Sequence, residues 1–128
     1  MTFKIFFDGG TRLMSTCVFD ETLSFYDVKH YNMKLTNNQL EYMALKHAID
    51  YADKLYSFLD NVVFLGDSEL IIKHMKGEYQ VKDIVLKGLY QGVSEDLLKI
   101  TGKPHSPDMF QWIARSFNEA GVHLEELG

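Results

Sequence analysis

The chain has 128 residues, 46% of them hydrophobic and 24% charged, and its single cysteine, Cys17, excludes an intrachain disulfide. With 13 Lys and Arg against 18 Asp and Glu, the net charge of −5 argues against tight nucleic-acid binding by a basic surface alone, but leaves open an acidic site that binds phosphates through metal ions. No apolar run approaches the ~20 residues of a membrane helix and no secretion signal is visible, so we expect one cytoplasmic, monomeric domain over 1–128, without a membrane or predictable protein partner.

The first half of the chain predicts three strands, a helix and a strand. Residues 2–8, 12–20 and 23–31 are rich in β-branched or aromatic residues, and the short gaps between them favour an antiparallel meander. Apolar residues then recur with helical spacing over 35–56, where Thr36 and Gln39 fit a capping box. A short apolar run at 61–66 is typical of a central strand covered on both faces.

The second half predicts a helix at 68–77 that ends at Gly77, and a helix at 83–100. A strand at 108–115 and a short helix at 117–127 follow. The order βββ-α-β-α-α-β-α predicts an α/β fold, a mixed sheet flanked by helices.

Three carboxylates stand where this fold would gather them. Asp8 ends the first strand, Asp67 follows the strand at 61–66, and Glu41 lies in the second turn of the long helix. Taken singly, Asp8 reads as a turn residue, Asp67-Ser68 as a helix cap and Glu41 as a solvated side chain. If the two strands are parallel neighbours, however, all three converge at the carboxyl edge of the sheet. Such a group predicts a site for Mg²⁺ or Mn²⁺, with two ions about 4 Å apart able to support phosphodiester displacement.

These residues also carry a family resemblance. The stretches "FFDGGTR", "TNNQLEYMAL" and "VVFLGDSELIIKHMKG", followed by "FQWIARSFNEAG", resemble a type 1 ribonuclease H domain over essentially the whole chain. The resemblance implies a ribonuclease H-like fold, with a five-stranded mixed sheet in the order 3-2-1-4-5. It also implies metal-dependent cleavage of the RNA strand of an RNA/DNA hybrid. By motif match, Asp8, Glu41 and Asp67 correspond to three of the family's four metal-binding acids.

The resemblance further implies a substrate-binding surface beside the acids. The helix N-terminus suits a phosphate, and amide side chains there can donate to the minor groove and to 2′-hydroxyls. The residues that the resemblance places against the nucleic acid are Gly9, Gly10, Thr36, Asn37, Asn38, Gln39 and Ser68.

The last helix departs from the family pattern. The fourth acid should follow an asparagine by four residues, and the residue four after Asn118 is Val122. His123, one residue further, is a candidate metal ligand or proton carrier, although a lone histidine is more often structural. Two alternatives therefore stay open: a binding module with little or no catalysis, and a related nuclease for structured DNA or double-stranded RNA.

Overall fold

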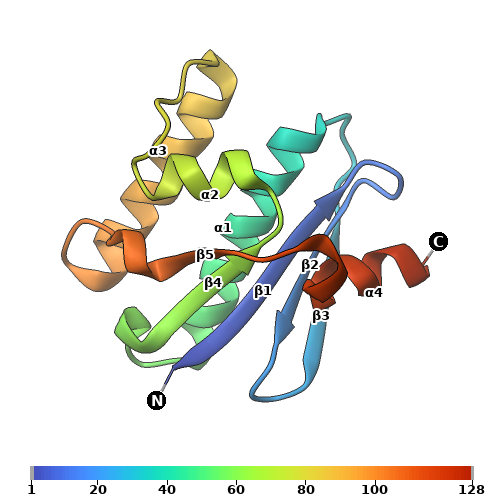
Figure 1. Cartoon of the computed structure of the whole chain (residues 1–128), viewed down its shortest axis with the longest axis horizontal. Helices are drawn as coiled ribbons and strands as arrows, with labels where there is room; N and C mark the ends of the chain where they lie inside the picture. Colours follow the sequence, from blue (N-terminus) through green and yellow to red (C-terminus); the bar gives the residue numbers. More distant parts are fainter. Residues whose placement is uncertain (1, 128) are drawn as a thin grey trace.

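The computed structural model describes residues 2–127, which form five strands and four α-helices joined by short 3₁₀ turns (Figure 1). The elements, in chain order, are β1 (Phe3–Gly10), β2 (Ser15–Asp20), β3 (Phe25–His30), α1 (Asn37–Leu55), β4 (Val62–Gly66), α2 (Glu69–Met75), α3 (Ile84–Thr101), β5 (Phe110–Trp112) and α4 (Glu119–Leu127). The predicted order of elements is confirmed.

The strands form one sheet in the order β3-β2-β1-β4-β5, as predicted. The meander β1-β2-β3 is antiparallel, whereas β4 runs parallel to β1 and β5 runs parallel to β4. The register pairs Phe3 with Val62 and Phe6 with Leu65, so β1 and β4 end at the same edge of the sheet. The residues at the carboxyl ends of these two strands therefore lie close together at this edge.

The two faces of the sheet are covered unequally. The larger core lies between the sheet and the helices α1, α2 and α3, and α1 packs against it through an apolar stripe that includes Leu45, Ala48 and Ile49. The other face carries only α4, which buries a small cluster with the sheet (Figure 1). The members of that cluster are Phe6, Cys17, Leu65, Ala120 and Leu124. Among the helices of residues 2–127, none combines the length and apolarity that a membrane crossing requires.

Some element boundaries differ from the prediction. The last strand was expected over 108–115 but spans only Phe110–Trp112, because a 3₁₀ turn that begins at Pro107 precedes it and another at Arg115–Phe117 follows it. The second strand begins at Ser15 rather than at residue 12, because Met14 adopts a left-handed conformation (φ 49°) that closes the preceding turn.

Candidate active site

Three carboxylates converge at the edge of the sheet where β1 and β4 end. Asp8 lies within the last residues of β1, Asp67 follows β4 directly, and Glu41 projects from the second turn of α1. One carboxylate oxygen from each residue lies within 4.8 Å of the other two. The structure thus brings together the three acids that the sequence predicts at one site.

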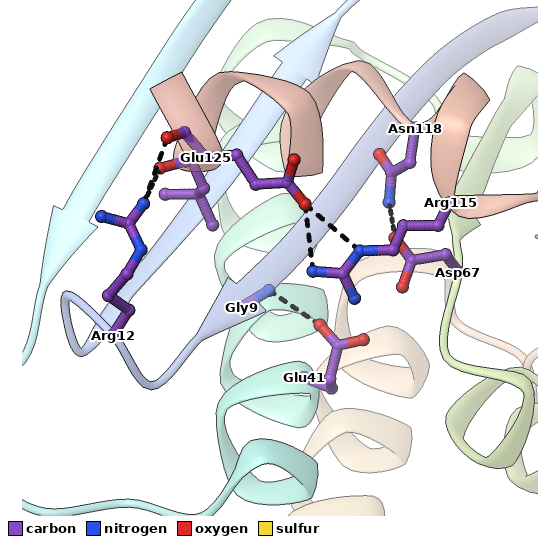
Figure 2. Close-up of polar contacts among 8 residues, drawn as sticks. Gly9, Arg12, Glu41, Asp67, Arg115, Asn118 and Glu125 are labelled. Carbon is purple, nitrogen blue, oxygen red and sulfur yellow. Dashed lines mark hydrogen bonds and ion pairs between the residues drawn. The ribbon is translucent and has the colours of Figure 1, made fainter. Parts of the chain in front are cut away.

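Glu41 is held in place by the backbone of β1. Its Oε1 accepts a hydrogen bond of 2.7 Å from the N–H of Gly9 (Figure 2). This contact requires close approach of α1 to β1, because a Cβ at position 9 would overlap the carbonyl oxygen of Leu40. Gly9 is therefore needed for packing between α1 and β1, a role that sequence reasoning did not assign to it.

Burial and neighbouring negative charge raise the pKa of two of the acids, Asp8 and Glu41. Burial raises the pKa of Asp8 to about 7, with the negative charge of Asp67 as the next cause. Burial and then the charge of Asp8 raise the pKa of Glu41 well above its ordinary value, against the hydrogen bond from Gly9. Asp8 and Glu41 are only 6% and 7% exposed, so water does little to relieve the repulsion. A hard divalent cation such as Mg²⁺ or Mn²⁺, bound by these closely placed carboxylate oxygens, would offset their repulsion.

The acids line a cleft of about 420 Å³ that extends to the predicted substrate-binding residues. Five of these residues line it: Gly9, Gly10, Asn37, Asn38 and Ser68. Thr36 and Gln39 instead form the predicted capping box of α1, with the Thr36 N–H donating to Gln39 Oε1 (3.1 Å) and the Gln39 N–H donating to Thr36 Oγ1 (3.2 Å). Ser68 also caps α2, since its hydroxyl accepts from the N–H of Ile71.

A buried asparagine orients the third acid. The Nδ2 of Asn118 donates to Asp67 Oδ2 and to the backbone oxygen of Phe7, both at 3.0 Å. Its Oδ1 accepts from the N–H of Ala120 at 3.2 Å, so one side chain joins β1, Asp67 and the start of α4. From the sequence, Asn118 served only as a marker for the fourth acid. Its position before a helix, typical of an N-cap, was the available signal for a structural role.

Comparison with solved structures identifies this architecture. No protein-family model and no curated protein sequence matches the chain. Solved structures do match it over nearly its whole length. The structure of LC11-RNase H1 in complex with an RNA/DNA hybrid superposes with a TM-score of 0.75 at 25% identity, covering 99% of this chain and 100% of that one. The chain is a ribonuclease H-like domain.

Further structures agree with this assignment. The N-terminal RNase H domain of rv2228c from Mycobacterium tuberculosis matches this chain at 25% identity and a TM-score of 0.70. The match covers 97% of this chain and 95% of that one. RNase H1 from Halobacterium salinarum matches at 23% identity and a TM-score of 0.75, covering 97% and 94%, and at that identity supports the fold alone. The two neighbours at 25% identity support a nuclease of this class.

Within the described residues, no carboxylate of α4 joins Asp8, Glu41 and Asp67 in their close group, although Glu125 lines the same cleft. The position that faces them is Gly121, where a Cβ would lie 3.1 Å from Asp8 Oδ2 and 3.5 Å from Asp67 Oδ2. Val122, which the sequence aligns with the fourth acid, is partly exposed and lies outside the cleft. In this ribonuclease H-like domain, Gly121 is the α4 residue that packs against Asp8 and Asp67.

His123 lies on a different side of α4. Its ring stacks on Tyr26 of β3, with 4.1 Å between ring centroids and 21° between planes. The hydroxyl of Tyr26 also donates to Glu119 Oε2 at 3.4 Å. The structure therefore does not bring His123 to the three acids, and we leave it out of the proposed site.

A basic residue that the sequence did not single out faces the acids instead. The Nε and Nη2 atoms of Arg115 donate to Glu125 Oε1 at 3.3 and 3.2 Å, and both residues line the cleft (Figure 2). The positive charge of Arg115 partly offsets the rise in the pKa of Asp8. The sequence gives no signal that Arg115 lies beside the acids. Its contact with Glu125 depends on which side of α4 faces the cleft.

Proposed function

We propose that this ribonuclease H-like domain is a metal-dependent endonuclease that cleaves the RNA strand of RNA/DNA hybrids. The observation that carries the proposal is the group Asp8, Glu41 and Asp67, whose carboxylate oxygens lie within 4.8 Å of one another in a cleft. The neighbour crystallised with an RNA/DNA hybrid supports this choice of substrate class.

Two of the three acids are held in place by hydrogen bonds. The Gly9 N–H fixes the carboxylate of Glu41, and the Asn118 amide fixes that of Asp67, so neither side chain needs to reorganise. Asp8 must lose its proton to serve as a ligand, and its raised pKa makes that step depend on pH near neutrality. A bound divalent ion would supply Lewis acidity toward the phosphate and stabilise the charge that develops during displacement.

The N-terminus of α1 supplies groups suited to reading the hybrid. The first N–H groups of a helix have no intrahelical acceptor, and Thr36 takes only that of Gln39. The backbone N–H groups and side-chain amides of Asn37 and Asn38 are therefore placed to donate to 2′-hydroxyls, base edges or a phosphate along the cleft. These contacts would distinguish the RNA strand, while the acids act on its backbone.

The direct test is incubation of the protein with end-labelled RNA/DNA hybrid, duplex RNA and duplex DNA, each with Mg²⁺, Mn²⁺ or EDTA. We expect the RNA of the hybrid to be cut with either ion and to stay intact in EDTA, and the two homoduplexes to be spared. Preferential cutting of duplex RNA or DNA would instead identify a related nuclease with another substrate.

Within residues 119–127, no carboxylate joins the close group of Asp8, Glu41 and Asp67, and this favours one competing function, a binding module with little catalysis. The same assay separates the two. A binding module would retain the hybrid in a gel-shift experiment and leave the RNA uncut under every metal condition.

A further inference from the structure

Arg115 occupies a place in the cleft that no carboxylate fills. Of the residues that line the cleft from the α4 side, Gly121 packs against Asp8 and Asp67 without a side chain, and Glu125 is turned toward Arg115. The guanidinium lies between Glu125 on one side and Glu41 and Asp67 on the other (Figure 2). The charged groups that face it are thus Glu125, Asp67 and Asp8.

The position of Glu125 is itself fixed by the opposite rim of the cleft. The Nη2 of Arg12, from the turn after β1, donates to the backbone oxygens of Leu124 at 2.9 Å and Glu125 at 3.2 Å (Figure 2). Arg12 therefore ties the end of α4 to β1, as a basic side chain near a helix C-terminus commonly does. Glu125 therefore positions Arg115, and Arg12 in turn holds the backbone of Glu125.

The remaining donors of Arg115 suit a phosphate. A guanidinium has five N–H donors in a planar fork, of which the two bonds to Glu125 leave three. Such a fork binds phosphate oxygens in a bidentate manner, which a metal-free carboxylate cannot do. The pair is exposed, with the Arg115 and Glu125 side chains 71% and 62% accessible, so little free energy opposes a shift of Arg115 toward an arriving phosphate.

Charge balance points the same way. The cleft holds four carboxylates, of which Glu125 is paired with Arg115, so one divalent ion would face the three remaining acids. A second divalent ion on the α4 side would meet the positive charge of Arg115 and find Gly121 in place of a ligand. Building on the proposed function, we propose that the site holds a single divalent ion, and that Arg115, positioned by Glu125, binds the reacting phosphate where a second ion would otherwise stand.

The first test measures Mn²⁺ binding to the full chain by isothermal titration calorimetry, without nucleic acid. We expect one ion per chain in the parent protein, and about tenfold tighter binding of that ion in Arg115→Ala, because a repelling charge is removed. Glu125→Gln should leave the number of ions at one, as should the matched control Glu126→Gln on the exposed side of the same helix. Two ions in the parent, or loss of an ion in Glu125→Gln alone, would overturn the proposal by making Glu125 a ligand.

The second test separates positioning from folding by hybrid cleavage. Arg115→Ala should lower kcat about a hundredfold, and Arg115→Lys should recover part of that loss because it restores the charge without the fork. Glu125→Gln should lower kcat about tenfold with its melting temperature unchanged, because an exposed ion pair contributes little stability. Parent-like kcat in Arg115→Ala contradicts the inference.

One further variant distinguishes this inference from the proposed function. Asp67→Asn should abolish Mn²⁺ binding if the acids form the metal site at all. Loss of binding in Asp67→Asn together with parent-like behaviour of Arg115→Ala would remove only the role of Arg115. Undiminished Mn²⁺ binding in Asp67→Asn would remove the proposed function itself.

Discussion

The two walls of the cleft are built in opposite ways. The wall formed by β1, α1 and β4 carries the three acids, of which Asp8 and Glu41 are less than a tenth exposed. The Gly9 N–H holds Glu41, and the Asn118 amide holds Asp67. The wall formed by α4 carries a glycine and an ion pair whose side chains are mostly exposed. Electrostatic interactions are therefore strong on the first wall and screened on the second.

This difference teaches which parts of the site tolerate change. On the first wall, the three acids lie close together, and Asp8 and Glu41 are also buried, so a single substitution alters the whole group. On the second wall, Arg115 and Glu125 can rearrange at little cost in stability. The predictions that follow test the first wall for the rigidity and coupling that the comparison attributes to it.

The largest expected effect comes from Glu41→Gln. The amide keeps the size of the side chain but removes its charge, so we expect hybrid cleavage to fall at least about a hundredfold. The exposed Glu95 of α3 offers a control of the same chemistry, and Glu95→Gln should cleave like the parent. Equal steady-state rates in the two variants would show that Glu41 is not needed for cleavage.

Gly9→Ala should destabilise the fold by about 2 kcal/mol, because the added methyl group would overlap the carbonyl of Leu40 and push α1 away from β1. Glu41 would then move away from the Gly9 N–H, so cleavage should fall as well. Gly10 provides a matched control, since the nearest atom to a Cβ there, Leu124 Cδ1, is 4.0 Å away. Urea denaturation should show a shifted midpoint for Gly9→Ala and a parent-like midpoint for Gly10→Ala.

Asp8→Asn should stabilise the metal-free protein in a pH-dependent manner. The folded-state pKa of Asp8 is raised from 3.8 to about 7, so the folded state prefers the protonated form and loses stability as pH rises through this range. The substitution removes that loss, and we expect a melting temperature roughly 5 °C above the parent at pH 8 in EDTA. At pH 3 the carboxyl is largely protonated in both states and the gain should vanish.

The exposed Asp53 of α1 supplies the control for this experiment. Asp53→Asn should melt like the parent at both pH values. An Asp8→Asn gain of the same size at pH 3 and pH 8 would mean that repulsion among the acids is not its source.

The smallest effect is expected at the rim of the cleft. Asn38→Ala removes side-chain donors from the first turn of α1, and the loss of one hydrogen bond should weaken hybrid binding by about 1 kcal/mol, roughly fivefold. Fluorescence anisotropy in EDTA measures this without cleavage. The exposed Asn32, before the helix, serves as the control. Identical affinities for Asn38→Ala and Asn32→Ala would remove the N-terminus of α1 from the binding surface.

The first wall could be predicted from the sequence because strong local signals determine it. Continuous apolar runs define β1 and β4. Because these strands are parallel neighbours, the acids at their carboxyl ends, Asp8 and Asp67, lie at the same edge of the sheet. The capping box of Thr36 and Gln39 fixes where α1 begins, and hence where Glu41 lies in its second turn.

The second wall could not be predicted in the same way. Helix α4 has nine residues, and each step along a helix turns the side chain by roughly 100°, so its register decides which residue enters the cleft. That register is fixed by tertiary contacts, namely the Asn118 bonds and the close packing of Gly121 on Asp8. Two residues after Gly121, His123 faces Tyr26 instead of the acids. Periodicity in so short a segment does not contain this information.

The central claim is that an ion held by Asp8, Glu41 and Asp67 is required to cut the RNA of a hybrid. Single-turnover cleavage by the parent and by Asp67→Asn, with protein in excess over labelled hybrid and with Mg²⁺ or EDTA, tests it most directly. We expect the parent to cut the RNA strand with Mg²⁺ and not in EDTA, and Asp67→Asn to stay below about 1% of the parent rate. Cleavage by Asp67→Asn at the parent rate, or cleavage by the parent in EDTA, would contradict the claim.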